Sequence, residues 1–331
     1  MTACGCSEHT HAVLAYVHDL DPVIWDIWRG VKLRWYGLAY LLAFLVAYYL
    51  LCYLSRKKLW VIVEKNIGDF IALLAMIGVF IGGRLGYVLF YMIPEHGWGP
   101  IAQDPLSIIR VWDGGMASHG GFLGVALFTL YYARKHKISW TGIGDGICIV
   151  APLGLMFGRL ANFINGELYG RVAAQLPWGV KFPQAFQEES YLVRETVITE
   201  IADRAPLIYE QMNQGMELSE AVRLSPEVKQ ICAEHLTARH PSQLYEGFCE
   251  GAFLFGLMWF LHFRYPRAPH GMICGIFFIL YGVLRTIVEH YREPDSSRIG
   301  PFTKGQFYSL FMVLAGAAFL FHAWKNRKQV G

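Results

Sequence analysis

Two arginines lie inside apolar stretches of the sequence, where inserting a charged side chain into a bilayer costs about 2.5–3.5 kcal/mol. Arg159 lies within FGRLANFINGELYGR, and Arg285 lies within GIFFILYGVLRTIVEHYREPD. A guanidinium can bind a phosphate through two parallel hydrogen bonds. We therefore expect Arg159 and Arg285 to hold an anionic group. Two alternatives stay open: Arg159 snorkels to the membrane surface, or Arg285 only forms an ion pair with Glu289.

Polar side chains accompany Arg159 at helical spacing. Asn162 follows it by three residues and shares its helix face. The pair Asn165-Gly166 ends the helix if either residue takes a left-handed backbone; otherwise the face continues. Glu167 lies just beyond, at the expected water boundary. A guanidinium and amides therefore converge at the outer end of this apolar stretch.

Carboxylates accompany the second arginine. Tyr281, Arg285 and Glu289 are spaced by four, so they form one stripe on a helix. In HPSQLYEGFCEG, Glu246 and Glu250 have the same spacing and repel each other. Such a pair requires basic partners, and the two intramembrane arginines are the candidates.

Histidine and tyrosine complete the chemistry-bearing set. His119 lies among glycines in RVWDGGMASHGGFLGV, and function or helix packing explains it equally well. Tyr87 and Tyr91 are spaced by four and line either an interface belt or a lipid cavity, and Tyr36 opens the first apolar stretch. Arginines, a histidine, tyrosines and carboxylates together indicate a pocket for a lipid phosphate head group.

The elements that position these residues are membrane helices. The chain has 331 residues, of which 54% are hydrophobic and 17% charged, with mean hydropathy +0.33. A soluble domain averages about 25% charged residues. The net charge of +3 gives no argument for nucleic-acid binding. The pattern predicts an all-α polytopic membrane protein, a bundle of about seven helices with a small extracytoplasmic head. The expected spans are 35–54, 68–93, 118–134, 143–165, 243–263, 271–291 and 306–324.

Basic clusters follow the first, third, fifth and seventh spans. The positive-inside rule then places the N-terminus outside and the C-terminus in the cytoplasm. We expect an extracytoplasmic arm over 1–34, four spans over 35–171, a periplasmic head or lid over 172–240 with a helix near 216–236, and three spans plus a tail over 241–331. The N-terminal CGC…H.H cluster is either a metal site or a frayed tail, and the sequence favours the tail.

The motifs RWYGL, GGRLGYVLFY, RVWDGGMASHGG, FGRLANFINGELYGR, HPSQLYE and LYGVLRTIVEHYREPD occur in order along the chain. In this arrangement the sequence resembles the prolipoprotein diacylglyceryl transferases of bacterial inner membranes. The resemblance implies transfer of diacylglyceryl from phosphatidylglycerol to the lipobox cysteine of a preprolipoprotein signal peptide, with a thioether as product, glycerol phosphate as leaving group, and no metal or other cofactor. It also implies functional positions. These are Tyr36, His119, Arg159, Asn162, Glu167, Gly170, Tyr281, Arg285 and Glu289.

Displacement by a thiol needs a base, and His119 is the first candidate, followed by Glu289 and Glu246. The predicted catalytic residues are His119, Arg159, Arg285 and Glu289. The predicted substrate-binding residues are Tyr36, Tyr87, Tyr91, Asn162, Glu167, Gly170, Glu246 and Tyr281. Three other functions stay open: a membrane acyltransferase built on His290–Asp295, a lipid or anion transporter, and a structural scaffold.

Overall fold

The computed structural model describes residues 15–28, 31–110, 114–293 and 300–326. The N-terminal Cys/His cluster and Asp295 lie outside this part of the chain. The chain divides into two compact units. Unit 1 comprises the residues up to Tyr40, Met156–Cys249 and Leu284–Tyr308, and unit 2 comprises Leu41–Leu155, Glu250–Val283 and the residues from Ser309. Each unit is described by itself.

Among the described residues, five helices are long and apolar enough to cross a membrane, and one shorter apolar helix joins them. This confirms the prediction of an all-α polytopic membrane protein. The five are α1 (Trp35–Arg56), the continuous stretch Glu64–His96, α7 (Trp140–Asn165), the stretch Ser242–Arg264, and α15 (Lys304–Asn326) from Gly305 onward; the shorter helix is α14 (Met272–Val288).

The expected third span is helical, as α6 (Ser118–His136). Among the described residues, however, it belongs neither to the five helices that are long and apolar enough to cross a membrane nor to the shorter apolar helices. The helix begins with a serine, a histidine and two glycines and ends with Arg134, Lys135 and His136, so its apolar part is short. A crossing by α6 stays a prediction.

Two of the membrane stretches contain π-helical turns, which are frequent at functional sites. Glu64–His96 consists of η1 (Glu64–Asn66), α2 (Ile67–Leu73), π-helical η2 (Leu74–Ile81), α3 (Gly82–Tyr87), π-helical η3 (Val88–Met92) and α4 (Ile93–His96). Ser242–Arg264 consists of α12 (Ser242–Glu246), π-helical η7 (Gly247–Phe253) and α13 (Leu254–Arg264). The short helices α5 (Gly99–Gln103) and η4 (Pro105–Ile108) follow α4.

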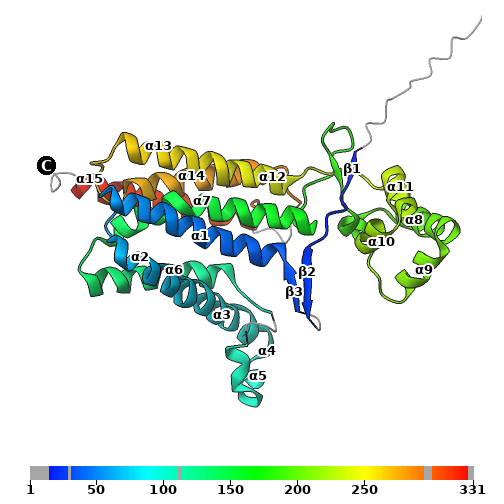
Figure 1. Ribbon diagram of the computed structural model, residues 1–331, viewed down its shortest axis with the longest axis horizontal. Helices are drawn as coiled ribbons and strands as arrows, with labels where there is room; N and C mark the ends of the chain where they lie inside the picture. The colour runs from blue at the N-terminus through cyan, green and yellow to red at the C-terminus, as the bar shows by residue number, and fades with distance from the viewer. Residues whose placement is uncertain (1–14, 29–30, 111–113, 294–299, 327–331) are drawn as a thin grey trace, which may run out of the picture. The chain divides into compact units, whose positions relative to one another are not determined.

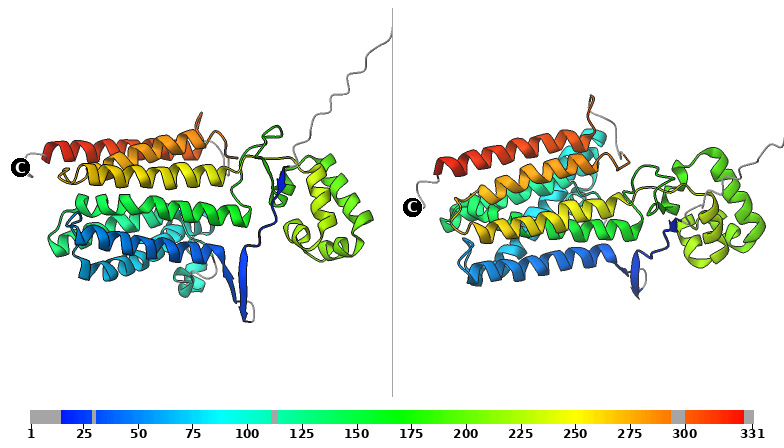
Figure 2. Two further views of the ribbon diagram at one scale, coloured as in Figure 1. Left: turned by 45° about the horizontal axis from the view of Figure 1, so that its top comes forward. Right: turned by 90° about the horizontal axis from the view of Figure 1, so that it is seen from above.

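The parts of α1, α7, α13, α14 and α15 that belong to unit 2 run alongside one another (Figure 1, Figure 2). A glycine seam joins η2 and α3 to α6. A Cβ at Gly120 would lie 2.4 Å from the carbonyl oxygen of Gly82, and one at Gly124 would lie 2.3 Å from that of Gly78. The seam therefore lets two helix backbones touch, as the glycine-rich motifs predict.

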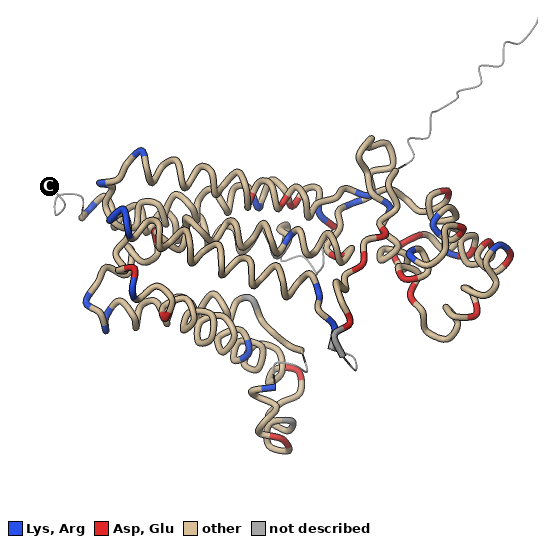
Figure 3. Tube along the Cα trace, in the orientation of Figure 1, with Lys and Arg blue, Asp and Glu red and all other residues tan. Residues whose placement is uncertain are grey.

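The basic ends of the helices lie on one side of unit 2. The helices α1, α6, α13 and α15 all end on that side, and lysines and arginines gather there (Figure 3). Their last turns contain Arg56, Arg134, Arg264 and Lys325, respectively. Positive charge at a single end of a helical bundle is the pattern that the positive-inside rule describes.

Unit 1 begins with short strands. β2 (Val23–Trp28) pairs antiparallel with β3 (Val31–Arg34), and α1 follows this hairpin directly in the chain. β1 (Tyr16–Val17) pairs in parallel with β4 (Val180–Lys181), which is followed by η6 (Pro183–Glu188).

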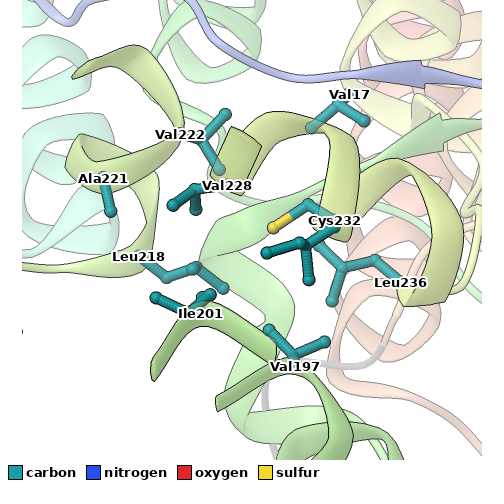
Figure 4. Packing of buried hydrophobic residues seen from close by; sticks show 10 residues of the cluster. Val17, Val197, Ile201, Leu218, Ala221, Val222, Val228, Cys232 and Leu236 are labelled. Atoms are coloured by element: carbon teal, nitrogen blue, oxygen red, sulfur yellow. The ribbon is translucent and has the colours of Figure 1, made fainter. Parts of the chain in front are cut away.

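Four helices of unit 1 pack around a small apolar core (Figure 4). They are α8 (Tyr191–Arg204), α9 (Pro206–Asn213), α10 (Leu218–Leu224) and α11 (Pro226–His235). The prediction of a single helix near 216–236 was wrong, because the helix is interrupted at Ser225. Pro226 has no N–H to continue the hydrogen-bond pattern of α10. The Ser225 hydroxyl instead accepts the N–H of Val228 at 3.3 Å and begins α11.

Candidate active site

Glu246 is the centre of the candidate site. It ends α12, and its side chain is fully buried. The Nε of Arg159 on α7 lies 2.7 Å from Glu246 Oε2. The Nη1 atoms of Arg285 on α14 and of Arg292 lie 3.5 Å and 3.3 Å from Oε1. Three guanidiniums from two helices and the segment after α14 therefore converge on a single carboxylate.

The second carboxylate of this group is Glu289. Arg285 Nη2 lies 2.8 Å from Glu289 Oε2, and the hydroxyl of Thr303 donates to Oε1 at 2.8 Å. The ion pair between Arg285 and Glu289 is thus present, but Arg285 also reaches Glu246. We call Arg159, Glu246, Arg285, Glu289 and Arg292 the ion cluster. Its members have three positive and two negative formal charges, and this excess suits an anion.

The two arginines predicted to act together are both largely out of water. The side chains of Arg159 and Arg285 are 17% and 13% exposed. Arg159 is ion-paired with Glu246, so its side chain does not simply reach outward toward water. A guanidinium that is largely shielded from water attracts an anion more strongly than one at the surface, because the local dielectric constant is lower.

The end of α7 forms a polar network beside this cluster. Asn162 is buried, and its Nδ2 donates to the hydroxyl of Tyr36 and to Glu167 Oε1, both at 2.8 Å. Gln243 Nε2 donates to the carbonyl oxygen of Glu167 at 2.7 Å. The helix ends at Asn165, and Gly166 has φ +69°, which decides between the two expectations for this pair. The sharp turn brings Glu167 back onto Asn162.

Gly170 lies between two other backbone segments. Its N–H donates to the carbonyl oxygen of His240 at 2.8 Å. A Cβ at this position would lie 2.4 Å from the carbonyl oxygen of Tyr291 and 2.6 Å from His240 Cβ. Gly170 therefore allows two other segments of this chain to approach its backbone closely, and its predicted role in substrate binding stays a prediction.

Gly170→Ala is expected to lower the free energy of unfolding by about 1–3 kcal/mol, because the added methyl group must push two backbone segments apart. Thermal unfolding in detergent measures the effect. The matched control is Gly158→Ala on α7, where an added Cβ meets no atom within 4 Å. Equal melting temperatures for the two variants would contradict this account of Gly170.

Four predicted residues belong to unit 2. The buried Arg84 donates to two carbonyl groups of η4 and to those of Gly114 and Gly115 in the following loop. Its guanidinium carbon lies 5.4 Å from the ring centre of Tyr87. Tyr87 and Tyr91 stack with ring centres 6.0 Å apart. A Cβ at Gly115, whose φ is +81°, would lie 2.5 Å from the Tyr87 ring. Tyr87 thus packs against the loop that Arg84 holds.

His119 and Tyr281 are the other two. His119 is exposed and follows the first residue of α6, next to the glycine seam. Tyr281 on α14 is half-buried and stacks on Phe277, with ring centres 5.8 Å apart. Unit 1 contains the remaining predicted residues. They are Tyr36, Arg159, Asn162, Glu167, Gly170, Glu246, Arg285 and Glu289.

Comparison with known proteins decides the family. A profile of the family described as prolipoprotein diacylglyceryl transferase matches residues 22–322. The chain belongs to the prolipoprotein diacylglyceryl transferase family. The resemblance inferred from its motifs is confirmed.

Individual members of the transferase family match nearly the whole chain. A protein of Serratia proteamaculans is 38% identical over 326 residues, which cover 97% of this chain and 98% of that protein. One of Psychrobacter arcticus is 37% identical over 312 residues, covering 92% and 94%. One of Cronobacter sakazakii is 36% identical over 323 residues, covering 95% and 97%. Each of the three is named phosphatidylglycerol–prolipoprotein diacylglyceryl transferase.

Two buried arginines of unit 1, Arg239 and Arg292, were not among the predicted site residues. Arg292 lies on the same side as Arg285 in the sequence pattern, and the structure places it on Glu246. Arg239 is 3% exposed. It lies in the polar stretch before α12, and an arginine in a polar stretch usually lies at the protein surface. Its position immediately before HPSQLYE was the available signal.

Proposed function

We propose that this transferase moves the diacylglyceryl group of phosphatidylglycerol to the thiol of the lipobox cysteine of a preprolipoprotein, an early step of bacterial lipoprotein maturation. The observation that carries the proposal is the convergence of Arg159, Arg285 and Arg292, from α7, α14 and the segment after α14, on the buried Glu246. Membership of the family and the printed names of its relatives support it.

The reaction is a displacement at the glycerol carbon that bears the phosphate. A carbon–sulfur bond forms, the carbon–oxygen bond breaks, and its electron pair leaves with glycerol phosphate. The thiol proton passes to a base and then to water or the released phosphate. Arg159 and Arg285 hold the phosphate and stabilise its growing negative charge. Glu246 keeps their guanidiniums together before the lipid binds, which reduces the ordering needed at that step.

Other residues take supporting roles in this proposal. Asn162, Glu167, Tyr281 and Glu289 orient the arginines and the head group, and Tyr36 anchors Asn162 through the hydroxyl contact at 2.8 Å. Tyr87 and Tyr91 line the path of the acyl chains. His119 is the first candidate for the base that makes the thiolate, because a thiol is mostly protonated at neutral pH.

We place the protein in the bacterial inner membrane as a multi-pass protein with a periplasmic N-terminus and a cytoplasmic C-terminus. The basic residues that gather where α1, α6, α13 and α15 end support this orientation. The segment 172–240 is then a periplasmic head or lid.

Purified protein in phosphatidylglycerol nanodiscs, incubated with a lipobox peptide, tests the proposal directly. Mass spectrometry is expected to find a diacylglyceryl thioether on the peptide and none on a Cys→Ser peptide. An acyl ester or amide would instead establish an acyltransferase, and lipid flux across vesicles without a covalent product would establish a transporter.

His119→Gln is expected to lower the transfer rate by about 10²–10⁴-fold with little change in phosphatidylglycerol binding, because the thiol loses its base. His96→Gln, a change at an exposed histidine of α4, is the control. Rates and lipid binding are measured on the same nanodisc samples. Weakened lipid binding at an unchanged maximal rate would instead make His119 a head-group ligand.

A further inference from the structure

A further buried arginine, Arg239, lies outside the ion cluster, in the link between α11 and α12. Arg239 is 3% exposed, although arginine is almost never so buried unless it is paired. Burying this charge costs free energy that its partners must offset. The identity of those partners therefore indicates what the residue holds in place.

The partners of Arg239 come from three different segments. Its Nη1 lies 3.0 Å from Glu188 Oε2 and 3.6 Å from Glu293 Oε2, and its guanidinium carbon lies 5.1 Å from the ring centre of Tyr169. The hydroxyl of Tyr169 donates to Glu188 Oε1 at 2.6 Å. Burial raises the pKa of Tyr169, and the hydrogen bond to Glu188 raises it further, so the hydroxyl stays a donor.

Backbone hydrogen bonds join the same segments. The N–H of Arg171 donates to the carbonyl oxygen of Tyr291 at 2.9 Å, and the N–H of His240 donates to that of Arg171 at 3.0 Å. Arg239 itself exchanges backbone hydrogen bonds with Val180 at 2.9 Å and 3.0 Å. Backbone hydrogen bonds therefore hold the segments around residues 170, 239 and 292 next to one another.

Each of these segments continues an element that bears the ion cluster. Tyr169 follows α7, which contains Arg159. Glu293 is the neighbour of Arg292 and follows α14. Arg239 precedes α12, which ends at Glu246. A single buried guanidinium thus contacts the outer continuations of α7 and α14 and belongs to that of α12.

We propose that Arg239 is a positioning residue that fixes the spacing of the ion cluster without touching it or the substrate. The inference rests on the proposed function, since it assigns Arg239 to the same reaction. Displacing a guanidinium by about 1 Å is enough to cost about 10²-fold in rate. The effect is expected in kcat, because the misplaced groups act on charge that develops in the transition state.

Steady-state kinetics of Arg239→Ala and Arg239→Lys in nanodiscs test this role. We expect kcat per folded molecule to fall by about 10–10²-fold in Arg239→Ala, with KM for phosphatidylglycerol nearly unchanged, and to recover partly in Arg239→Lys. The control is Arg204→Ala, which breaks the exposed ion pairs with Glu200 and Glu234. A kcat near the wild-type value, or a loss that only follows the folded fraction, would overturn the proposal.

Hydrogen exchange gives a second readout that does not depend on the reaction. Peptides covering 169–172, 238–240 and 291–293 are expected to lose protection together in Arg239→Lys, while those covering α8–α11 keep theirs. Unchanged protection refutes the positioning role. If Arg239→Ala fails to fold, Glu293→Gln tests the contact beside Arg292. If the wild type forms no thioether, the proposed function fails, and the exchange data alone decide whether Arg239 fixes these segments.

Discussion

Arg285→Gln is expected to lower the rate of diacylglyceryl transfer by about 10²–10³-fold, the usual loss when one donor to a developing oxyanion is removed. Arg285 contacts both Glu246 and Glu289, so glutamine also removes the link between the two carboxylates. Arg264→Gln, at the exposed end of α13, is the matched control, because this arginine belongs to no predicted site. The assay measures thioether formation with saturating lipobox peptide.

Arg159→Gln is expected to behave in the same way, and the double variant should lose little more than either single one. The two arginines share Glu246 and would bind one phosphate, so their contributions are not additive. A near-normal rate in either single variant would remove the phosphate clamp from the mechanism. Fully additive losses would mean that the two guanidiniums act at separate places.

Glu246→Gln is expected to abolish transfer and to lower the free energy of unfolding by about 3–5 kcal/mol. The substitution leaves three guanidiniums around a fully buried side chain that has no charge. Removing one partner from a buried ion group is strongly destabilising, because the remaining charges lose their compensation. Thermal unfolding and the transfer assay measure the two effects, with the exposed Glu210→Gln on α9 as control.

A second substitution separates charge balance from simple loss of packing. Adding Arg292→Gln to Glu246→Gln removes one of the uncompensated cations, so the double variant should regain part of the lost stability. If the double variant is as unstable as the sum of the single variants, the charge argument for Glu246 fails.

The membrane fold follows from the composition of the sequence. The places where the structure differs from the prediction have local causes. Long apolar runs with basic ends predict the spans, since hydrocarbon leaves few alternatives to the helix. The helix expected near 216–236 breaks because Pro226 can begin a helix but cannot continue α10. The limited apolar length of α6 follows from the polar residues at both of its ends.

The ion cluster was predictable in kind but not in arrangement. A charged residue inside an apolar run is unusual, which is why Arg159, Arg285 and Glu246 were selected from the sequence. That three arginines share Glu246 depends on how the helices pack, and spacing along one helix contains no such information. Arg239 was not predicted, because its neighbours in the sequence are polar and such a stretch gives no sign that one of its arginines is buried. Its burial follows only from the fold.

The π-helical turn η7 begins directly after Glu246. It limits which deletions this part of the chain can tolerate. A π-turn holds one residue more than an α-turn, so losing one residue would restore α-helical winding. Each residue turns an α-helix by about 100°, which would point Glu246 in a new direction with respect to the rest of its span. Deletion of a single residue in η7 would therefore turn Glu246 away from its arginine partners and inactivate the enzyme, whereas a substitution there leaves the number of residues in the turn unchanged.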